Sequence, residues 1–435
     1  MADYNEIYKQ KLTTAEDIAA QVQSGWMLGM DAGPTQASLI VDTIAQKIAQ
    51  TDTTGVKLQM MLDTYPYPFM QDEALRGKFT AYSWFSSGGL RKAVNNGMAD
   101  VLPSYYRDIP GHIIREYDYD AFLVSVSPMD KHGYFSMATS CSYSPAMISK
   151  AKRIFVEVNK YQPRCVSGIQ LHVSEVAGIV ENHHALPVMA PAVLDEKSLL
   201  IGNLIAEQID DGSCIQLGIG AIPDATGMAL KTKKDLGIHT EMFVDSMIEL
   251  LECGAVNNSK KQIHRGKSVT TFSYGSQRIY DFLDDNPSIE IMPVNYTNDP
   301  MIICQNDNMI SINSALEVDL FGQVCAESVG TKHMSGSGGQ VDFVRGACQS
   351  KGGKSFIAFT STAKDDTISK IKSTLTPGAI VTTSKNDVDY IVTEYGIAHL
   401  RGRSLGERTK QLIAIAHPNF RDELTFEAKK RGIII

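Results

Sequence analysis

One carboxylate in this sequence is a candidate for chemistry because apolar residues flank it. Glu241 lies in the segment GIHTEMF at 237–243, shortly after the lysine-rich stretch 231–234. A partly desolvated carboxylate that faces a glycine-lined pocket can attack an activated acyl group. The same pattern also fits an acid at the start of a helix or an ordinary surface charge. The residues alone leave these alternatives open.

A first glycine-rich segment could bring backbone N–H groups close to a ligand. It reads QLGIGAIP at 216–223, ends an apolar run and leads into a helix expected to begin near Asp224. Such turns direct free N–H groups toward an anion. A plain tight turn is the alternative. A dinucleotide-binding fingerprint is disfavoured because proline occupies position 223, where a third glycine would allow close packing of helix on strand.

A second glycine cluster, SGSGG at 335–339, precedes the segment QVDF at 340–343. Three basic residues, Arg345, Lys351 and Lys354, follow within a short stretch. A flexible linker would have this glycine content too. The apolar and aromatic residues directly behind the glycines favour a loop that binds an anion or lets the backbone approach a ligand closely.

Other reactive residues lack the partners that their chemistry would need. His183 and His184 have no spaced cysteine or acidic ligands, so we expect no metal site. No GxSxG elbow is present to anchor a serine hydrolase. The seven cysteines are scattered, odd in number and without a CxxC pair, which is typical of reduced thiols in a cytoplasmic protein.

Length and charge restrict the class of protein further. At 435 residues the chain exceeds the usual size of one hydrophobic core, so we expect two domains. A formal net charge of -8 argues against nucleic acid as a partner. No apolar stretch has the length of a membrane span, and residues 1–17 lack the apolar region of a secretory signal. We therefore expect a cytoplasmic protein without a membrane partner.

A weak internal repeat indicates the elements that position the candidate residues. It begins near residue 15 and again near residue 200, each time with an amphipathic helix that stops at a glycine, Gly25 or Gly212, before an apolar run and a turn. Apolar runs that alternate with helical patterns predict parallel α/β sheets. The runs are 56–62, 121–126 and 154–158 in the first half, and 268–274, 289–294, 355–360 and 379–383 in the second.

The repeat predicts an α/β protein of two similar domains with parallel-rich sheets. We place the domains at 1–190 and 191–435, with the boundary in the proline-containing segment 186–191. The second domain carries Glu241 and both glycine segments. Because ligands in open α/β folds bind at the carboxyl ends of strands, we expect the active site in the cleft between the domains.

Six ordered blocks resemble the acetyl-CoA hydrolase/transferase branch of the class I CoA-transferases. Within that branch the resemblance is to the butyryl-CoA:acetate and 4-hydroxybutyrate CoA-transferases, and it spans nearly the whole chain. The blocks are QLGIGAIPDA at 216–225, GIHTEM at 237–242, PVNYTNDP at 293–300, SINSALEVDLFGQV at 311–324, GSGGQVDFVRGA at 336–347 and VTEYGIAHLRGRSL at 392–405.

The resemblance implies roles for individual residues. Glu241 matches the family's catalytic glutamate, which carries coenzyme A (CoA) as a γ-glutamyl thioester. Asn298 resembles an asparagine near the reacting centre, and the Gly339 amide resembles an oxyanion donor. The implied CoA contacts are Gln216, Leu217, Gly218, Ile219, Gly220, Leu316, Gly339 and Lys351.

The resemblance also implies an activity, namely transfer of CoA from a short-chain acyl-CoA to acetate, butyrate or 4-hydroxybutyrate. CoA would be a co-substrate, with no tightly bound cofactor and no metal, and the protein would be a homo-oligomer, a dimer or a tetramer. An acyl-CoA hydrolase on the same fold and a non-catalytic CoA sensor are the alternatives. Segments 30–34 and 84–89 depart from the family pattern, so the preferred acid stays open.

Overall fold

The computed structural model describes residues 4–434, which fold into two compact units. The first unit takes the chain up to Ala190 together with Thr270–Tyr296, and the second takes Pro191–Val269 together with the chain from Thr297 onward. The sequence-based division had placed all residues after 190 in the second domain. Thr270–Tyr296 instead returns to the first unit.

Backbone hydrogen bonds explain the return of this segment. The Thr271 carbonyl accepts the N–H groups of Cys141 and Ser142, at 2.9 and 3.2 Å. The N–H of Ser273 donates to the Thr139 carbonyl at 2.8 Å. A contiguous domain boundary drawn from sequence could not anticipate this, because the partners lie more than 120 positions apart in the chain.

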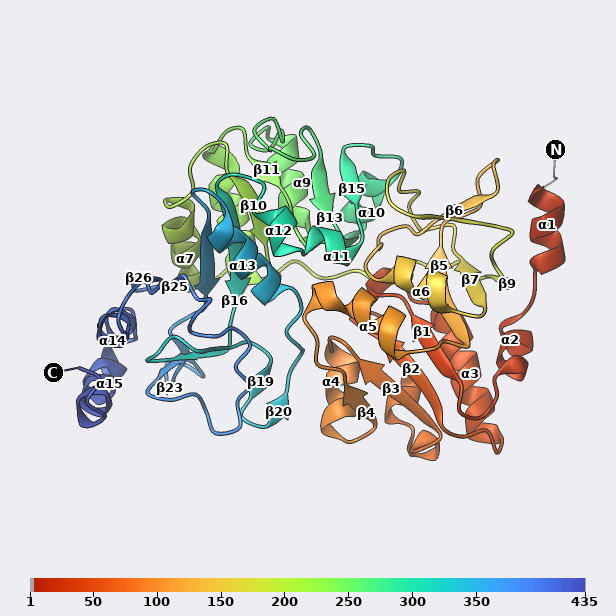
Figure 1. The fold of residues 1–435 in the computed structure, drawn as a ribbon, viewed down its shortest axis with the longest axis horizontal. Coiled ribbons are helices and arrows are strands. Elements are labelled where there is room, and N and C mark those ends of the chain that lie inside the picture. The colour runs from red at the N-terminus through yellow and green to blue at the C-terminus, as the bar shows by residue number, and fades with distance from the viewer. Residues whose placement is uncertain (1–3, 435) are drawn as a thin grey trace. The chain divides into compact units, whose positions relative to one another are not determined.

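The first unit is built on a seven-stranded sheet in which β1 lies between β2 and β5 (Figure 1). Every pairing in it is parallel. In sheet order the strands are β4 (Ala99–Val101), β3 (Phe79–Ser83), β2 (Val56–Met60), β1 (Met27–Met30), β5 (Ala121–Val126), β7 (Ile154–Val158) and β9 (Gly178–Glu181). All residues of β5 are buried, as expected for a parallel strand covered on both faces.

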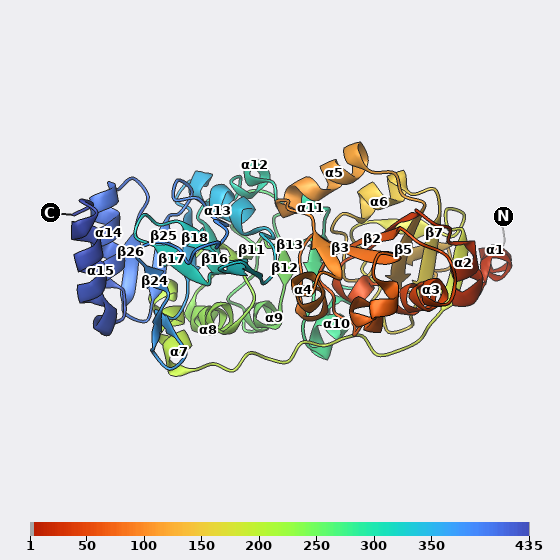
Figure 2. The ribbon, with the colours of Figure 1, turned by 90° about the horizontal axis from the view of Figure 1, so that it is seen from below.

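Helices cover both faces of this sheet. Figure 2 shows α3 on one side of the strands, and α5 with α6 on the other. In α3 the buried residues recur at helical spacing, at Ile40, Ile44 and Ile48, so one face of the helix packs on the sheet. The helices of this unit are α1 (Tyr4–Lys11), α2 (Ala15–Gln21), α3 (Ser38–Gln50), α4 (Gly88–Asn95), α5 (Ile109–Glu116), α6 (Ser144–Lys150) and α10 (Gln277–Leu283).

The second unit is built on a six-stranded sheet with β10 beside β11 and β16. Its strands are parallel except for β26, which pairs antiparallel with β25. In sheet order they are β11 (Gly237–Ile238), β10 (Cys214–Leu217), β16 (Met309–Ser314), β21 (Lys354–Ala358), β25 (Tyr390–Thr393) and β26 (Gly396–His399). The small sheets of this unit use β17 (Glu317–Asp319), β18 (Val324–Cys325), β19 (Ser328–Val329), β20 (Lys332–His333), β22 (Thr362–Ala363), β23 (Ile368–Ser369) and β24 (Ile371–Lys372).

Helices cover this second sheet on both faces as well. α8 packs against β10 and β16, while α13 packs against β16 and β21. Figure 2 shows α8 and α13 on opposite sides of the strands. The helices are α7 (Glu196–Ala206), α8 (Ala221–Ala229), α9 (Asp245–Glu252), α12 (Pro300–Ile303), α13 (Gln340–Gln349), α14 (Leu405–Ala414) and α15 (Pro418–Lys430).

The α/β class, two similar sheets and parallel strands are thus confirmed, but three predicted runs differ. Run 268–274 divides into β13 (Ser268–Thr270) and β14 (Phe272–Ser273), and run 289–294 contributes only β15 (Ile289–Ile291); none belongs to the six-stranded sheet. Run 379–383 forms no strand, and its Thr383 makes only an isolated bridge to Val324. Ile380 and Val381 are 46% and 44% exposed, whereas a strand inside a parallel sheet is buried on both faces.

Among the helices formed by residues 4–434, none combines the length and the apolar character needed to span a membrane.

Candidate active site

Glu241 lies three residues beyond the carboxyl end of β11. Strand β11 pairs in parallel with β10, with Ile238 opposite Ile215. The His239 N–H then donates to the Ile215 carbonyl at 3.2 Å, and the Thr240 N–H donates to the Val269 carbonyl at 2.9 Å. These bonds hold the chain up to the residue before Glu241, so its carboxyl group has a defined position at the strand end.

His239 supports this site from behind. Its buried ring donates from Nε2 to the Thr297 carbonyl at 2.8 Å, directly before Asn298. Burial, together with the nearby Lys261 cation, lowers the pKa of His239 to about 3. The imidazole is therefore neutral at physiological pH and holds the backbone beside Asn298 in place.

Two donors converge on the Glu241 carboxyl group. Asn298 Nδ2 donates to Glu241 Oε2 at 2.7 Å, and the backbone N–H of Gly339 donates to the same carboxyl group. Gly339 is the residue that precedes α13, so the carboxyl group also faces a helix N-terminus, which favours negative charge. The three sequence-predicted residues Glu241, Asn298 and Gly339 are therefore in direct contact.

Desolvation has the largest effect on the pKa of Glu241. Burial raises its pKa to about 7, while the bonds from Asn298 and Gly339 act in the opposite direction. The carboxylate is thus available near neutral pH but poorly solvated. A carboxylate that is partly desolvated and keeps two directed donors can act as a nucleophile toward an activated carbonyl group.

Gly339 is required by space rather than by backbone conformation. Its φ of -95° is accessible to any residue. A Cβ atom there would lie 1.8 Å from Glu241 Oε2 and 2.2 Å from Asn298 Nδ2. Any side chain at this position would therefore displace the Glu241 carboxyl group and the Asn298 amide, which gives the last glycine of the second cluster a physical reason.

The expected CoA loop divides into a buried and an accessible part. Gln216 and Leu217 belong to β10 and are buried. The Gln216 Oε1 atom accepts from Ser311 Oγ at 2.9 Å and from the Ile312 N–H at 3.2 Å. The Gln216 side chain thus joins β10 to β16 within the sheet.

Gly218, Ile219 and Gly220 form the accessible part of this loop. The Gly218 N–H donates to the Ile312 carbonyl at 2.8 Å, and the Ile219 side chain is 46% exposed. Gly220 has a φ of 121°, which L side chains rarely adopt, and it precedes α8. Helix α8 begins at Ala221, three residues earlier than the sequence predicted. The turn therefore presents its backbone and the α8 N-terminus at the carboxyl end of β10.

Leu316 and Lys351 lie at opposite ends of the strands, because Leu316 follows the carboxyl end of β16 and Lys351 precedes the amino end of β21. Leu316 is partly buried just after β16, and its N–H donates to the Cys325 carbonyl at 2.9 Å. Lys351 follows the carboxyl end of α13, whereas Gly339 precedes the amino end of the same helix. A helix of ten residues spans about 15 Å, so Lys351 is outside the Glu241 cluster. Its Nζ lies 3.7 Å from Asp307, with the side chain 87% exposed.

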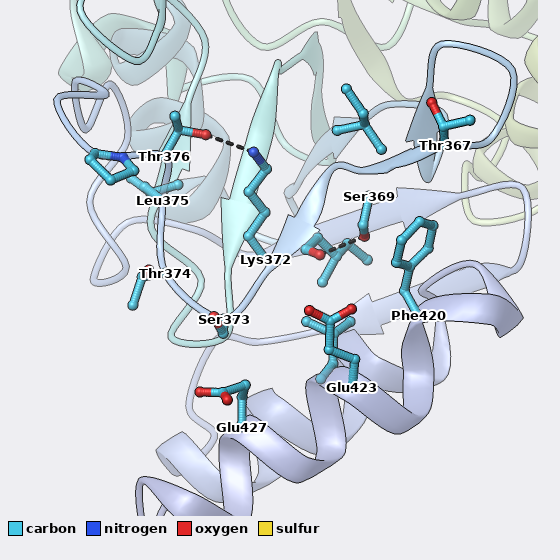
Figure 3. A pocket seen from close by; sticks show the side chains of 14 residues that line it. Thr367, Ser369, Lys372, Ser373, Thr374, Leu375, Thr376, Phe420, Glu423 and Glu427 are labelled. Carbon is cyan, nitrogen blue, oxygen red and sulfur yellow. Dashed lines mark hydrogen bonds between the residues drawn. The ribbon is translucent and has the colours of Figure 1, made fainter.

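A groove of about 460 Å³ elsewhere in the second unit uses none of these residues. It lies between the β23–β24 segment, the turn at 373–377 and α15 (Figure 3). Lys372 in this groove is paired with Glu317 at 2.9 Å and with Thr376 Oγ1 at 2.6 Å. Its cation is therefore already neutralised, and the groove lacks the arrangement of nucleophile and donors found at Glu241.

The sequence patterns indicate no role for His239 or Asp342, although both lie in the blocks that resemble the family. Asp342 is buried, and its Oδ2 lies 3.5 Å from Asn298 Nδ2. Their positions could have indicated a role, because His239 lies two residues before Glu241 and Asp342 lies three residues after Gly339.

In residues 4–434, no group of three or more His, Cys, Asp or Glu side chains is arranged to hold a metal ion.

Comparison with known proteins finds two family models, one in each half of the chain. The family model of the acetyl-CoA hydrolase/transferase N-terminal domain matches residues 1–190, and that of the C-terminal domain matches residues 275–428. The succinyl-CoA:cyclohexane-1-carboxylate CoA transferase of Geobacter metallireducens is 46% identical over 99% of this chain and 98% of its own. The 4-hydroxybutyrate coenzyme A transferase of Clostridium kluyveri is 43% identical over 99% and 100%. The crystal structure of RipA from Yersinia pestis matches with a TM-score of 0.93, at 37% identity and 100% coverage of both chains.

Proposed function

Because the chain belongs to the acetyl-CoA hydrolase/transferase family, we propose that it transfers CoA from a short-chain acyl-CoA to a free carboxylate. Glu241 is the covalent nucleophile in this proposal. The observation that carries it is the Glu241 carboxyl group, desolvated yet held by the Asn298 amide and the Gly339 N–H.

The reaction proceeds through two acyl derivatives of Glu241. Its carboxylate attacks the thioester carbonyl of the donor, the C–S bond breaks, and CoA leaves as a thiolate from a mixed anhydride. The thiolate then attacks the glutamyl carbonyl carbon and releases the donor acid as a carboxylate. The enzyme now carries CoA as a γ-glutamyl thioester, and the acceptor carboxylate reverses both steps.

Each attack generates a tetrahedral centre with negative charge on oxygen. Backbone and amide donors that are already directed at this position stabilise the charge, each by about 3 kcal/mol in comparable sites. The Gly339 N–H and the Asn298 amide supply such donors at the Glu241 carboxyl group. The loop at Gly218–Gly220 and Leu316 would hold the CoA portion of the substrate, whose binding energy can be used at the reacting carbonyl group.

A covalent-adduct experiment tests the nucleophile. Incubation with an acyl-CoA and no acceptor should leave CoA attached to the peptide that contains Glu241, and borohydride should inactivate the protein only after donor has been added. Glu241→Gln should reduce transfer by at least about a thousandfold, because an amide is a much weaker nucleophile. Glu241→Asp should be severely impaired, because the shorter side chain withdraws the carboxylate.

Glu249→Gln is a matched control for these variants. Glu249 belongs to the same unit but is a half-exposed partner of Lys231 at 2.6 Å, so its loss should leave transfer near the parent rate. A CoA adduct on another residue, or near-parental transfer by folded Glu241→Gln, would contradict the proposal.

The acid substrate requires a panel of donors and acceptors. Acetate, butyrate and 4-hydroxybutyrate represent the short-chain class, and succinate and cyclohexane-1-carboxylate represent the named substrates of the Geobacter relative. Transfer should depend on the added acceptor. Release of free CoA at the same rate without any acceptor would instead identify an acyl-CoA hydrolase.

A further inference from the structure

The Asn298 amide presents its nitrogen to two carboxyl groups. Its Nδ2 donates to Glu241 Oε2 at 2.7 Å and lies at the longer distance of 3.5 Å from Asp342 Oδ2. Asn298 is 0% exposed and Asp342 is 1% exposed, so water does not compete for these contacts. An amide nitrogen carries two N–H groups and can serve both acceptors at once.

The oxygen atom of the same amide does not fix the orientation of the side chain. In the part of the chain that the structure describes, Asn298 Oδ1 has no hydrogen-bond partner. A flipped amide would place this oxygen against carboxyl oxygens of Glu241 and Asp342, which is electrostatically unfavourable. The two carboxyl groups therefore determine which way the amide faces.

Glu241 can orient the amide strongly only while it is ionised. In the covalent cycle proposed above, on which this inference rests, Glu241 becomes an anhydride and then a thioester, and both are uncharged. Asp342 forms and breaks no bond in that cycle. It also occupies the third position of α13, where the helix N-terminus stabilises negative charge.

We infer that Asp342 is a positioning residue that keeps the Asn298 N–H directed at the glutamyl carbonyl oxygen while Glu241 carries CoA. The acceptor carboxylate then attacks a carbonyl group whose oxyanion donor is already in place. Asp342 acts through Asn298 and contacts no substrate atom. The competing explanation is that Asp342 only stabilises the first turn of α13.

The second half-reaction separates these explanations. The CoA adduct is formed on the parent protein and on the variants Asp342→Leu, Asp342→Asn, Asn298→Ala and the double variant Asn298→Ala/Asp342→Leu. Each adduct is mixed with acetate, and its decay is followed together with the appearance of acetyl-CoA. Leucine resembles aspartate in shape but lacks an acceptor, whereas asparagine retains one acceptor oxygen.

Asp342→Leu should slow the decay of the adduct about tenfold or more, with little change in KM for the acyl-CoA donor, and Asp342→Asn should stay within about threefold of the parent. In the Asn298→Ala background, Asp342→Leu should cause no further slowing, because residues that act through one another are not additive. If Asp342→Leu does not fold, the small effect of Asp342→Asn must vanish in the Asn298→Ala background.

Equal slowing by Asp342→Leu in both backgrounds would overturn the inference. A lower melting temperature with parallel losses in CoA affinity and in both half-reactions would also overturn it, in favour of a purely structural role. Failure of the parent protein to form an adduct on Glu241 would count against the proposed function instead.

Discussion

Gly339→Ala is the substitution whose effect the structure defines most closely. The new Cβ atom would lie 1.8 Å from Glu241 Oε2 and 2.2 Å from Asn298 Nδ2. Ordinary contacts require about 3.5 Å, so the carboxyl group must retreat by about 1.7 Å. A misplacement of about 1 Å can cost a hundredfold in rate, and loss of one oxyanion donor costs about a hundredfold to a thousandfold. We expect kcat to fall at least about a thousandfold.

The fold should survive this change. The backbone of Gly339, at φ -95° and ψ 11°, is accessible to alanine, and the crowded atoms belong to the site rather than to the apolar core. Circular dichroism and thermal unfolding should therefore resemble those of the parent, while acetate-dependent CoA transfer is measured over a range of donor concentrations.

Two glycine variants control for crowding and for the added methyl group. Gly346→Ala lies in the same helix but places its Cβ 2.5 Å from Ile303 Cγ2, so it should lower stability by about 1–3 kcal/mol and leave transfer measurable at low temperature. Gly111→Ala in α5 meets only the movable end of Arg115 and should behave like the parent. Transfer by folded Gly339→Ala within tenfold of the parent rate would refute the reasoning.

Three further outcomes follow from the same geometry. Because burial raises the pKa of Glu241 to about 7, kcat/KM should fall about tenfold per pH unit below that value as the Glu241 carboxylate is protonated. His239, with a pKa of about 3, adds no second step to the profile. A flat profile of kcat/KM between pH 5 and 8 would contradict the assignment of Glu241. Because folding raises the pKa of Glu241 from its ordinary 4.5 to about 7, this group costs the fold stability progressively as the pH rises from about 4.5 to 7, with the full loss present above pH 7. Glu241→Gln should therefore raise the free energy of unfolding by up to about 3 kcal/mol at pH 8 but not at pH 4, as denaturant titrations at both pH values would show. Gly218→Val would place its Cβ 3.2 Å from the Ile312 carbonyl oxygen and should raise KM for the acyl-CoA donor, whereas an unchanged KM would separate this loop from CoA binding.

The sequence predicts a strand correctly where the residues that cause the strand to form all lie within one short segment. Runs 121–126 and 154–158 became β5 and β7 with the predicted bounds, because a strand buried on both faces is a continuous apolar run. Run 379–383 shares that composition but forms no strand, since its exposure depends on which elements lie beside it. An apolar composition allows a segment to be buried, but the elements that pack beside the segment determine whether it is buried.

The sequence by itself determined the α/β class, the family and the identity of Glu241, Asn298 and Gly339 as candidates, since six ordered blocks carry that information. It left Glu241 undecided between a surface acid and a nucleophile. Tertiary structure shows that Glu241 is not an isolated surface acid, because the donors at 298 and 339 reach its carboxyl group across 57 and 98 positions of chain. The pKa of a carboxyl group depends on the water removed from it, and that loss arises only when distant segments pack around it.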